Sequence, residues 1–158
     1  MKVYVTVGTH RQQFNRLLEA VDLWVKKSKN TNVFAQTGNS DYLPKHFKSQ
    51  KFLSDKEYEK NMKNSEVIVT HAGAGTIINA LNLKKSIVII PRLKKFGEHT
   101  NDHQLELADV LEKEGLVLSA NENNFSDVIQ KARNFKPKIR SEKKKTIKII
   151  NDFLSDLE

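Results

Sequence analysis

The chain has 158 residues, a size that fits one ordinary domain with its own hydrophobic core. It contains no cysteine, which excludes a disulfide framework and a thiolate metal site, and its formal net charge is +8. The apolar run at residues 2–8 is too short for a secretory signal or a membrane span, so we expect a cytoplasmic protein.

The N-terminal part of the chain has a strand, helix, strand pattern. Residues 2–7 alternate and are rich in β-branched side chains, which predicts a strand that ends at Gly8. Apolar residues then recur at helical spacing over 14–25, which predicts an amphipathic helix. Residues 32–37 predict a second strand.

The same alternation continues through the middle of the chain. A short apolar piece at 52–53 predicts a third strand, and residues 54–57 (Ser-Asp-Lys-Glu) have the spacing of a capping box, which predicts that a helix begins there. Residues 67–70 predict a buried strand, followed by a glycine-rich turn and a helix that extends to Leu83. The nearly continuous apolar run 86–91 predicts a central parallel strand, because such a strand is covered on both faces.

The last third of the chain begins with a polar loop over 92–102. A helix is predicted over 104–113, ended by Gly115, and a last strand over 116–118. The C-terminal segment 136–158 is predicted to be a basic amphipathic helix that packs on the domain or on a partner. Its apolar residues on one helical face are Ile147, Ile150, Phe153, Leu154 and Leu157.

Strands that alternate with helices of this length predict an α/β fold with one doubly wound parallel sheet, formed by a single domain over 1–158. Ligands of such sheets bind beyond the carboxyl ends of the strands. A binding site is therefore expected among four turns, at residues 8–13, 38–41, 71–76 and 91–104.

Two of these turns combine glycine with threonine and run directly into helices. Gly8–Thr9 and Gly73–Thr76 therefore predict a site for an anion such as phosphate, because glycine lets backbone amides approach an oxygen and a helix N-terminus carries positive charge. On spacing alone, the same glycines could serve only to reverse the chain. Ile78 stands where a dinucleotide fingerprint needs its third glycine, and no Walker loop is present, which argues against NAD and ATP.

The loop 97–104 (GEHTNDHQ) concentrates side chains that can bind sugar hydroxyls. Its histidines and acids could also form a metal site, but they lack ligand spacing on a helix, so we expect no metal. His10 and His71 are candidates for a catalytic base, although a histidine at a strand end more often has a structural hydrogen-bonding role.

Taken in order, residues 71–81 (HAGAGTIINAL), 91–92 (PR) and 97–104 closely resemble the C-terminal domain of family 28 glycosyltransferases. The opening 5–14 (VTVGTHRQQF) is similar to short bacterial exopolysaccharide or capsule subunits of the PssE type. These subunits are also similar to the soluble subunit of the eukaryotic UDP-GlcNAc transferase that acts on dolichol-linked GlcNAc. The resemblance, which covers roughly residues 1–120, implies a Rossmann-like domain equivalent to the C-terminal lobe of a GT-B glycosyltransferase.

The resemblance implies a hexosyltransferase subunit that binds a UDP-sugar donor and needs no metal or other cofactor. A separate membrane-anchored subunit would supply the acceptor lobe and the catalytic base. A hydroxyl of a lipid-linked sugar would attack the anomeric carbon of the donor sugar, so that UDP leaves and the configuration at this carbon is inverted. The chain would then be cytoplasmic, peripheral at the inner face of the plasma membrane, and the isolated chain could form a homodimer through the surface that its partner would cover.

Residue by residue, the resemblance assigns the donor site to the glycine turns and to the loop after the central strand. Asn79 stands where many relatives place a glutamate that holds the ribose hydroxyls. The positions expected to bind the donor are Gly8, Thr9, His10, His71, Gly73, Ala74, Gly75, Thr76, Asn79, Arg92, Glu98, His99, Asp102, His103 and Gln104.

Two other functions stay open at this point. The chain could be a non-catalytic activator of a membrane-bound glycosyltransferase, although a scaffold would not need intact glycine and Asp-His-Gln motifs. A basic nucleic-acid-binding protein would use the segment from Lys136 to Lys148, where seven basic residues stand against Glu142. Because aromatic residues are not interleaved with these lysines, we expect no nucleic acid partner. An anionic membrane, an acidic face of the partner, or solvent alone fits the basic segment better.

Overall fold

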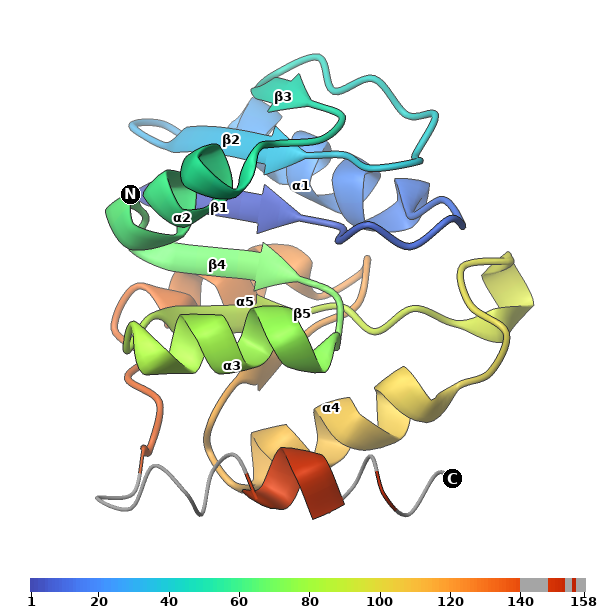
Figure 1. Cartoon of the computed structure of the whole chain (residues 1–158). Coiled ribbons are helices and arrows are strands. Elements are labelled where there is room, and N and C mark those ends of the chain that lie inside the picture. Colours follow the sequence, from blue (N-terminus) through green and yellow to red (C-terminus); the bar gives the residue numbers. More distant parts are fainter. Residues whose placement is uncertain (140–147, 153–154, 156–158) are drawn as a thin grey trace.

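The computed structural model of the chain describes residues 1–139, 148–152 and 155. The strands are β1 (Lys2–Thr6), β2 (Asn32–Gln36), β3 (Lys48–Gln50), β4 (Val67–Thr70), β5 (Ser86–Ile89) and β6 (Leu118–Ser119). They form one six-stranded parallel sheet in the order β3-β2-β1-β4-β5-β6 (Figure 1), which confirms the predicted doubly wound α/β fold. The strand order reverses between β1 and β4, so a topological switch point lies at the carboxyl ends of these two strands.

Helices cover both faces of the sheet. They are α1 (Asn15–Lys27), α2 (Asp55–Asn64), α3 (Ala74–Asn82), α4 (His103–Lys113) and α5 (Phe125–Ala132), with a 3-10 turn η1 (Lys94–Phe96). Helices α1 and α5 lie on one face, where Trp24 meets Phe125 edge to face at 5.8 Å between ring centroids. Helices α2, α3 and α4 bury Met62, Ile77 and Leu111 against the other face (Figure 1). The sheet is therefore sandwiched between two apolar layers, which fixes the loops at its carboxyl edge.

Two predicted strands are misplaced. The third strand is β3 at Lys48–Gln50, where the prediction at 52–53 was wrong, because all three residues of this edge strand are exposed and carry no apolar signal. The last strand is the two-residue β6, whereas the buried Leu116 and Val117 of the predicted strand precede it. Phe52 and Leu53 thus lie outside the third strand, and of the predicted last strand only Leu118 lies in β6.

Two helix starts illustrate what the local sequence encodes. The predicted capping box at α2 is present, since Ser54 Oγ accepts the Glu57 amide at 3.4 Å and the Glu57 carboxylate accepts the Ser54 amide at 2.9 Å. Helix α5 is absent from the predicted elements, although Phe125, Val128 and Ile129 give it a fully apolar, buried stripe.

The predicted C-terminal amphipathic helix lies partly outside the described residues. Residues 148–152 are helical, and Ile150 is fully buried in the apolar layer that contains α4. The other residues of its predicted apolar face, Ile147, Phe153, Leu154 and Leu157, lie outside the described residues, as does the lysine-rich part of the basic segment between 140 and 147.

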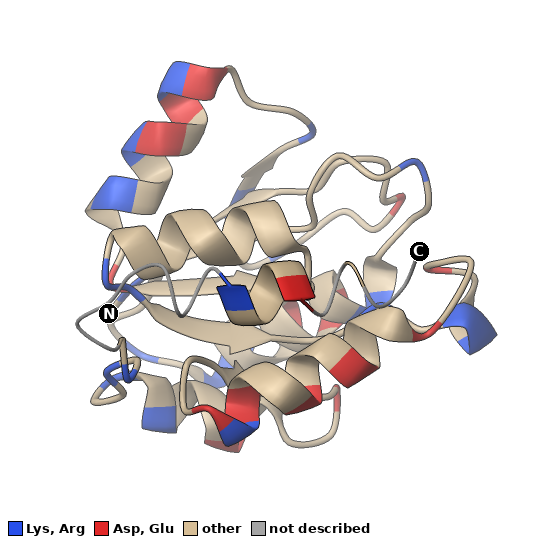
Figure 2. Cartoon of the chain, turned by 60° about the horizontal axis from the view of Figure 1, so that its bottom comes forward, with Lys and Arg blue, Asp and Glu red and all other residues tan. Residues whose placement is uncertain are grey.

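Charges of both signs mix on the surface helices that the structure describes. Figure 2 shows lysines alternating with aspartate and glutamate along α2, while α4 carries mainly acidic residues. Within residues 1–139, 148–152 and 155, no helix is both long enough and apolar enough to cross a membrane. Helix α3, by contrast, carries no charged residue.

Candidate functional site

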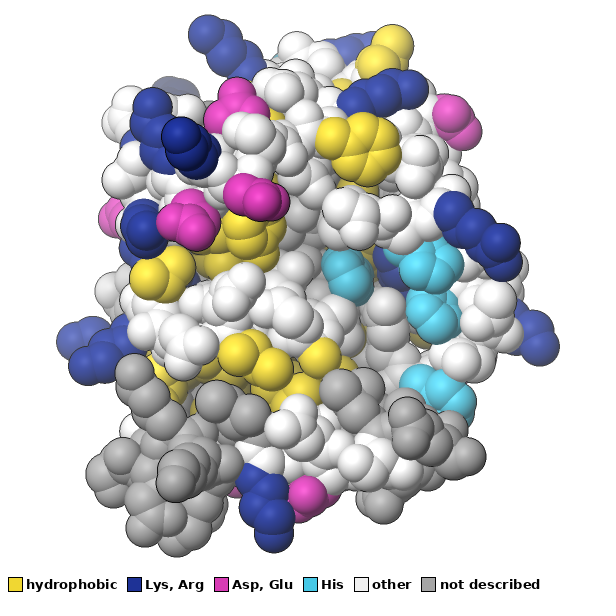
Figure 3. Space-filling model, viewed as in Figure 1, with side chains coloured by type: hydrophobic (Ala, Val, Ile, Leu, Met, Phe, Trp, Pro, Cys, Tyr) yellow, Lys and Arg dark blue, Asp and Glu magenta, His cyan; other side chains and the backbone are white. Residues whose placement is uncertain are grey.

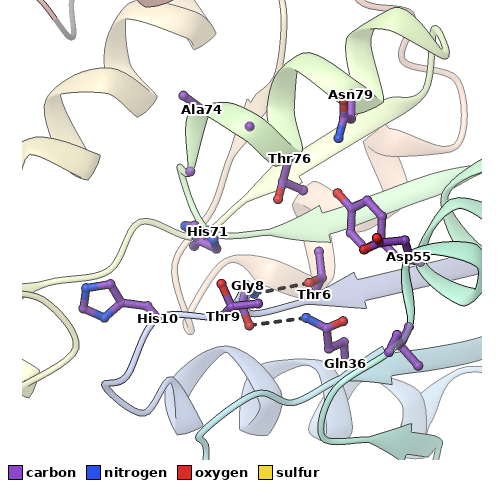
Figure 4. Close-up of a pocket in the computed structure, with 14 residues that line it drawn as sticks. Thr6, Gly8, Thr9, His10, Gln36, Asp55, His71, Ala74, Thr76 and Asn79 are labelled. Atoms are coloured by element: carbon purple, nitrogen blue, oxygen red, sulfur yellow. Dashed lines mark hydrogen bonds between the residues drawn. The ribbon is translucent and has the colours of Figure 1, made fainter.

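A cavity of about 500 Å³ opens at the switch point, where the carboxyl ends of β1 and β4 face the N-terminus of α3. Figure 4 shows its walls, which come from both glycine turns, the end of β2 and the start of α2. The lining residues are Thr6, Gly8, Thr9, His10, Gln36, Leu53, Asp55, Tyr58, His71, Gly73, Ala74, Gly75, Thr76 and Asn79.

The N-terminus of α3 forms one wall of this cavity. Gly73 is the N-cap residue, and in the described part of the chain no side chain caps the helix. The first amides of a helix have no partner within it, so those at the start of α3 are available to an anion, with the hydroxyl of Thr76 beside them (Figure 4). Apart from its chain neighbours and the backbone of its own helix, no heavy atom of the described residues lies within 4 Å of the point where a Cβ on Gly75 would stand. The backbone is therefore open to a ligand at this point.

The turn after β1 supports the cavity from below. Gly8 has φ +75°, its amide donates to Thr6 Oγ1 at 3.2 Å, and its carbonyl accepts from Gln36 Nε2 at 3.4 Å (Figure 4). Because the Gly8 amide already has a partner, Gly8 shapes the turn, while Thr9 lies at its exposed rim. Both residues, which the sequence predicts to bind an anion, line the cavity.

The ring of His71 packs between the two glycine turns. A Cβ on Gly8 would come within 2.5 Å of His71 Nε2, and a Cβ on Gly73 would also clash with this ring. These glycines therefore make room for an imidazole, a reason that spacing alone did not show. Burial, aided by the positive charge of Arg92, lowers the pKa of His71 to about 3, so its ring is neutral at physiological pH and is a poor general base.

We expect His71, which is partly buried, to make the protein less stable in mild acid. The pKa of this histidine is the ordinary 6.5 in the unfolded chain and about 3 in the folded chain. Between these two pH values only the unfolded chain binds the proton, so the free energy of unfolding falls as the pH drops from 6.5 toward 3. Between pH 7 and pH 5 this group alone should remove roughly 2 kcal/mol from the free energy of unfolding. Urea denaturation at both pH values should show a smaller acid loss in His71→Gln, and parallel pH profiles would contradict this role.

His10 extends from the cavity toward the loop that precedes α4. Its ring stacks on His99, with 5.0 Å between centroids and 25° between planes, and Figure 3 shows histidines gathered beside the hollow on this face. Burial, and then the charge of Arg92, lowers the pKa of His10. His10 lines the cavity, whereas His99 touches it only through this stack.

Arg92, expected among the donor-binding residues, lies outside the cavity and is fully buried. Its guanidinium stacks on Phe14 at 4.6 Å and donates to four backbone carbonyls, those of Val7 at 2.8 Å, Gln13 and Glu98 at 3.0 Å, and Gln12 at 3.1 Å. Burial lowers its pKa to about 10, which still leaves it charged at pH 7. Arg92 therefore ties the loop after β5 to the turn after β1.

Glu98 is also engaged inside the protein. It is 1 % exposed and accepts two hydrogen bonds from Arg16, at 3.0 and 2.7 Å, in a bidentate pair. Its carboxylate also accepts the Leu93 amide at 2.9 Å. Arg16 and Glu98 thus lock the loop that carries η1 onto α1, and Glu98 does not face the cavity.

The remaining predicted residues organise the start of α4. Asp102 Oδ1 accepts the Lys94 amide at 2.8 Å, and His103 Nδ1 lies 3.5 Å from Glu106 Oε2. Gln104 Oε1 accepts the Arg92 amide at 3.1 Å, and the Gln104 side chain also interacts with the ring of His71. The structure does not bring these three residues to the cavity wall. Among the described residues, no cluster of three or more His, Cys, Asp or Glu could hold a metal ion.

Sequence reasoning missed one side of the cavity. Gln36 comes from the end of β2, and Leu53, Asp55 and Tyr58 come from the turn and first helical turn after β3. The signal that could have found them is the rule that ligands lie at strand ends, applied to the capping box that marks the start of α2.

Several known proteins are similar in sequence to this chain. It is 29% identical over 124 residues to UDP-N-acetylglucosamine transferase subunit ALG13 of Mus musculus, a match that covers 72% of this chain and 10% of that protein. It is 24% identical over 148 residues to a UDP-N-acetylglucosamine--N-acetylmuramyl-(pentapeptide) pyrophosphoryl-undecaprenol N-acetylglucosamine transferase of Prochlorococcus marinus, which covers 89% of this chain and 39% of that protein. The chain thus spans a minor part of these relatives.

Solved structures share the fold. The glycotransferase of kitacinnamycin superposes with a TM-score of 0.68 at 15% identity, over 96% of this chain and 39% of that one. The solution structure of ALG13 gives 0.61 at 16% identity, over 91% of both chains. The sheet therefore matches the C-terminal lobe of GT-B glycosyltransferases. The glycosyltransferase family 28 C-terminal domain matches residues 2–157, and the chain belongs to this family.

Proposed function

We propose that this chain binds the UDP-sugar donor of a two-component, inverting glycosyltransferase. The observation that carries the proposal is the uncapped N-terminus of α3, which opens onto a 500 Å³ cavity at the switch point of the sheet. Anions bind at such helix ends, and the cavity has the volume of an ordinary small-molecule site. The family of the chain and the UDP-N-acetylglucosamine transferases among its relatives support a nucleotide sugar as the ligand.

The two ends of the cavity suit the two ends of such a donor. The diphosphate would lie at the first amides of α3, beside the hydroxyls of Thr9 and Thr76. The nucleoside would extend toward the apolar and aromatic surface of Leu53 and Tyr58, and the sugar toward His10. The amides at the start of α3 would then stabilise the charge that develops on the UDP leaving group, because they are already oriented before the reaction.

A separate subunit would provide the acceptor lobe. The chain covers only 10% and 39% of the mouse and Prochlorococcus relatives, and the mouse protein is itself called a subunit. The catalytic base belongs to the partner in this proposal, because the pKa of about 3 makes His71 a poor base. The similarity of residues 5–14 to PssE-type subunits supports exopolysaccharide or capsule synthesis as the setting, with a hexose added to a lipid-linked sugar at the inner face of the plasma membrane.

Calorimetric titration tests the donor site. The chain should bind one of UDP-glucose, UDP-galactose, UDP-GlcNAc and UDP-glucuronate, and bind UDP, while ADP and NAD serve as controls. Thr76→Val should weaken binding roughly 10- to 100-fold, since a hydrogen bond to a charged group contributes about 1.5–3 kcal/mol. Thr31→Val, outside this cavity, is the matched control and should bind as the wild type does.

Two outcomes would redirect the proposal. If neither the chain nor its co-expressed pair with a partner binds a UDP-sugar, the donor-site proposal is wrong. If the pair transfers sugar equally well with Gln104→Ala and Thr76→Val, the chain acts as an activator of the other subunit.

A further inference from the structure

We propose that Asp55 recognises the ribose of the bound nucleotide and thereby selects ribonucleotides over 2′-deoxyribonucleotides. This inference rests on the proposed function. It adds a carboxylate from α2, which sequence motifs did not point to, to the ribose contact expected at Asn79 in the same cavity. It follows from the charge, position and surroundings of one carboxylate in the cavity.

Asp55 is the single carboxylate among the described residues that line the cavity, and no lysine or arginine lines it. Figure 4 shows its side chain directed from α2 into the cavity, on the side of Gln36 and Asn79. Within the described part of the chain, the carboxylate has no hydrogen-bond or ion-pair partner. An exposed carboxylate of this kind retains its full capacity to accept hydrogen bonds from a ligand.

The wall that carries Asp55 is held in place by neighbouring residues. The capping box of Ser54 and Glu57 fixes the first turn of α2, with the Glu57 carboxylate 2.7 Å from Ser54 Oγ. One turn later, Tyr58 meets the buried ring of Tyr4 edge to face, with 6.1 Å between centroids. Glu57 is therefore occupied in capping, and Asp55 is the acid of this turn that is left for a ligand.

The charge of Asp55 decides which part of a nucleotide it can contact. A carboxylate repels a diphosphate, so the phosphates belong at the opposite end, at the start of α3. It also repels the two carbonyl oxygens that flank the N3–H group of uracil. The two neighbouring hydroxyls of ribose offer two donors and no fixed negative charge, which suits an acceptor-only carboxylate at the rim of the cavity.

The test compares UDP with 2′-deoxy-UDP by calorimetric titration. The wild-type chain should bind UDP roughly 10-fold more tightly, the effect of one hydrogen bond to a partly exposed carboxylate. Asp55→Asn and Asp55→Ala should lower the affinity for UDP to that for 2′-deoxy-UDP and leave the latter within twofold of the wild type. Asp55→Glu should retain part of the preference, because it keeps the carboxylate.

The matched control is Glu59→Gln, which removes a charge from the same helix outside the cavity and should retain the full preference. If Asp55→Asn and Asp55→Ala lose equal affinity for UDP and 2′-deoxy-UDP, or lose affinity for neither, the ribose contact is wrong and the donor site still stands. A wild-type chain that binds UDP-sugars but does not distinguish UDP from 2′-deoxy-UDP would also overturn it. Absence of all UDP binding by the chain and by the pair would instead refute the proposed function, and this inference with it.

Discussion

Replacing Arg92 with methionine should destabilise the protein by about 3–5 kcal/mol, the usual loss when a buried charged hydrogen-bonding group is removed from its partners. The variant leaves the carbonyls of Val7, Gln12, Gln13 and Glu98 without the guanidinium that joins them. Methionine fills a similar volume but donates no hydrogen bond, so the loss reports the missing polar contacts more than a cavity. Urea denaturation followed by circular dichroism measures it directly.

Two further variants separate the geometry of Arg92 from its charge. Arg92→Lys keeps the charge but lacks the planar fork that reaches several carbonyls at once, so its loss should lie between those of the wild type and Arg92→Met. Lys94→Met, an exposed residue two positions away, should change stability by less than about 0.5 kcal/mol. If Arg92→Met has the same urea midpoint of unfolding as the wild type, the loops are held without this side chain.

The central part of the fold could be predicted because burial leaves a pattern in the sequence. β4 and β5 are buried along their full length and appear as unbroken apolar runs. β3 could not be predicted, because its Lys-Ser-Gln sequence is exposed on both faces at the sheet edge and is defined only by pairing with β2. Helix α5 was missed for a different reason. Its apolar stripe is present in the sequence, but the helix has only eight residues, too few for the helical spacing to stand out.

The candidate site could be predicted only where it is local in sequence. The turn Gly73–Thr76 precedes a helix directly, so its place at the cavity follows from the chain itself. Gln36 and Asp55 reach the same cavity through the order of the strands, which spacing does not reveal. Arg92 was expected at the donor site because the motif 91–92 resembles the family, but three of the four hydrogen bonds of its guanidinium go to carbonyls about 80 positions away. A motif shared with the family could not show that this arginine joins two loops inside the protein instead of lining the cavity.

Replacing Gly8 with alanine should cost about 2–5 kcal/mol through two separable effects. The backbone of Gly8 is left-handed, with φ +75°, which disfavours alanine by about 1–2 kcal/mol. The new Cβ would also lie 2.5 Å from His71 Nε2 and 3.3 Å from His71 Cδ2, and overpacking of this kind costs about 1–3 kcal/mol. Urea denaturation of the single variant measures the sum of the two.

A double-mutant cycle with His71→Ala separates these effects, because removing the imidazole abolishes the clash and leaves the backbone strain. In the His71→Ala background, Gly8→Ala should therefore cost only about 1–2 kcal/mol, so that the two substitutions show a coupling of about 1–3 kcal/mol. Gly97→Ala provides an independent measure of the strain alone, since Gly97 has φ +66° and, apart from its two chain neighbours, no heavy atom of the described residues lies within 4 Å of its Cβ position. If Gly8→Ala costs no more than Gly97→Ala, the ring of His71 yields to the new methyl group and the glycine is required only by its backbone conformation. If Gly8→Ala lowers the free energy of unfolding more in the wild-type protein than in His71→Ala, as expected, position 8 needs glycine to leave room for the neutral imidazole of His71.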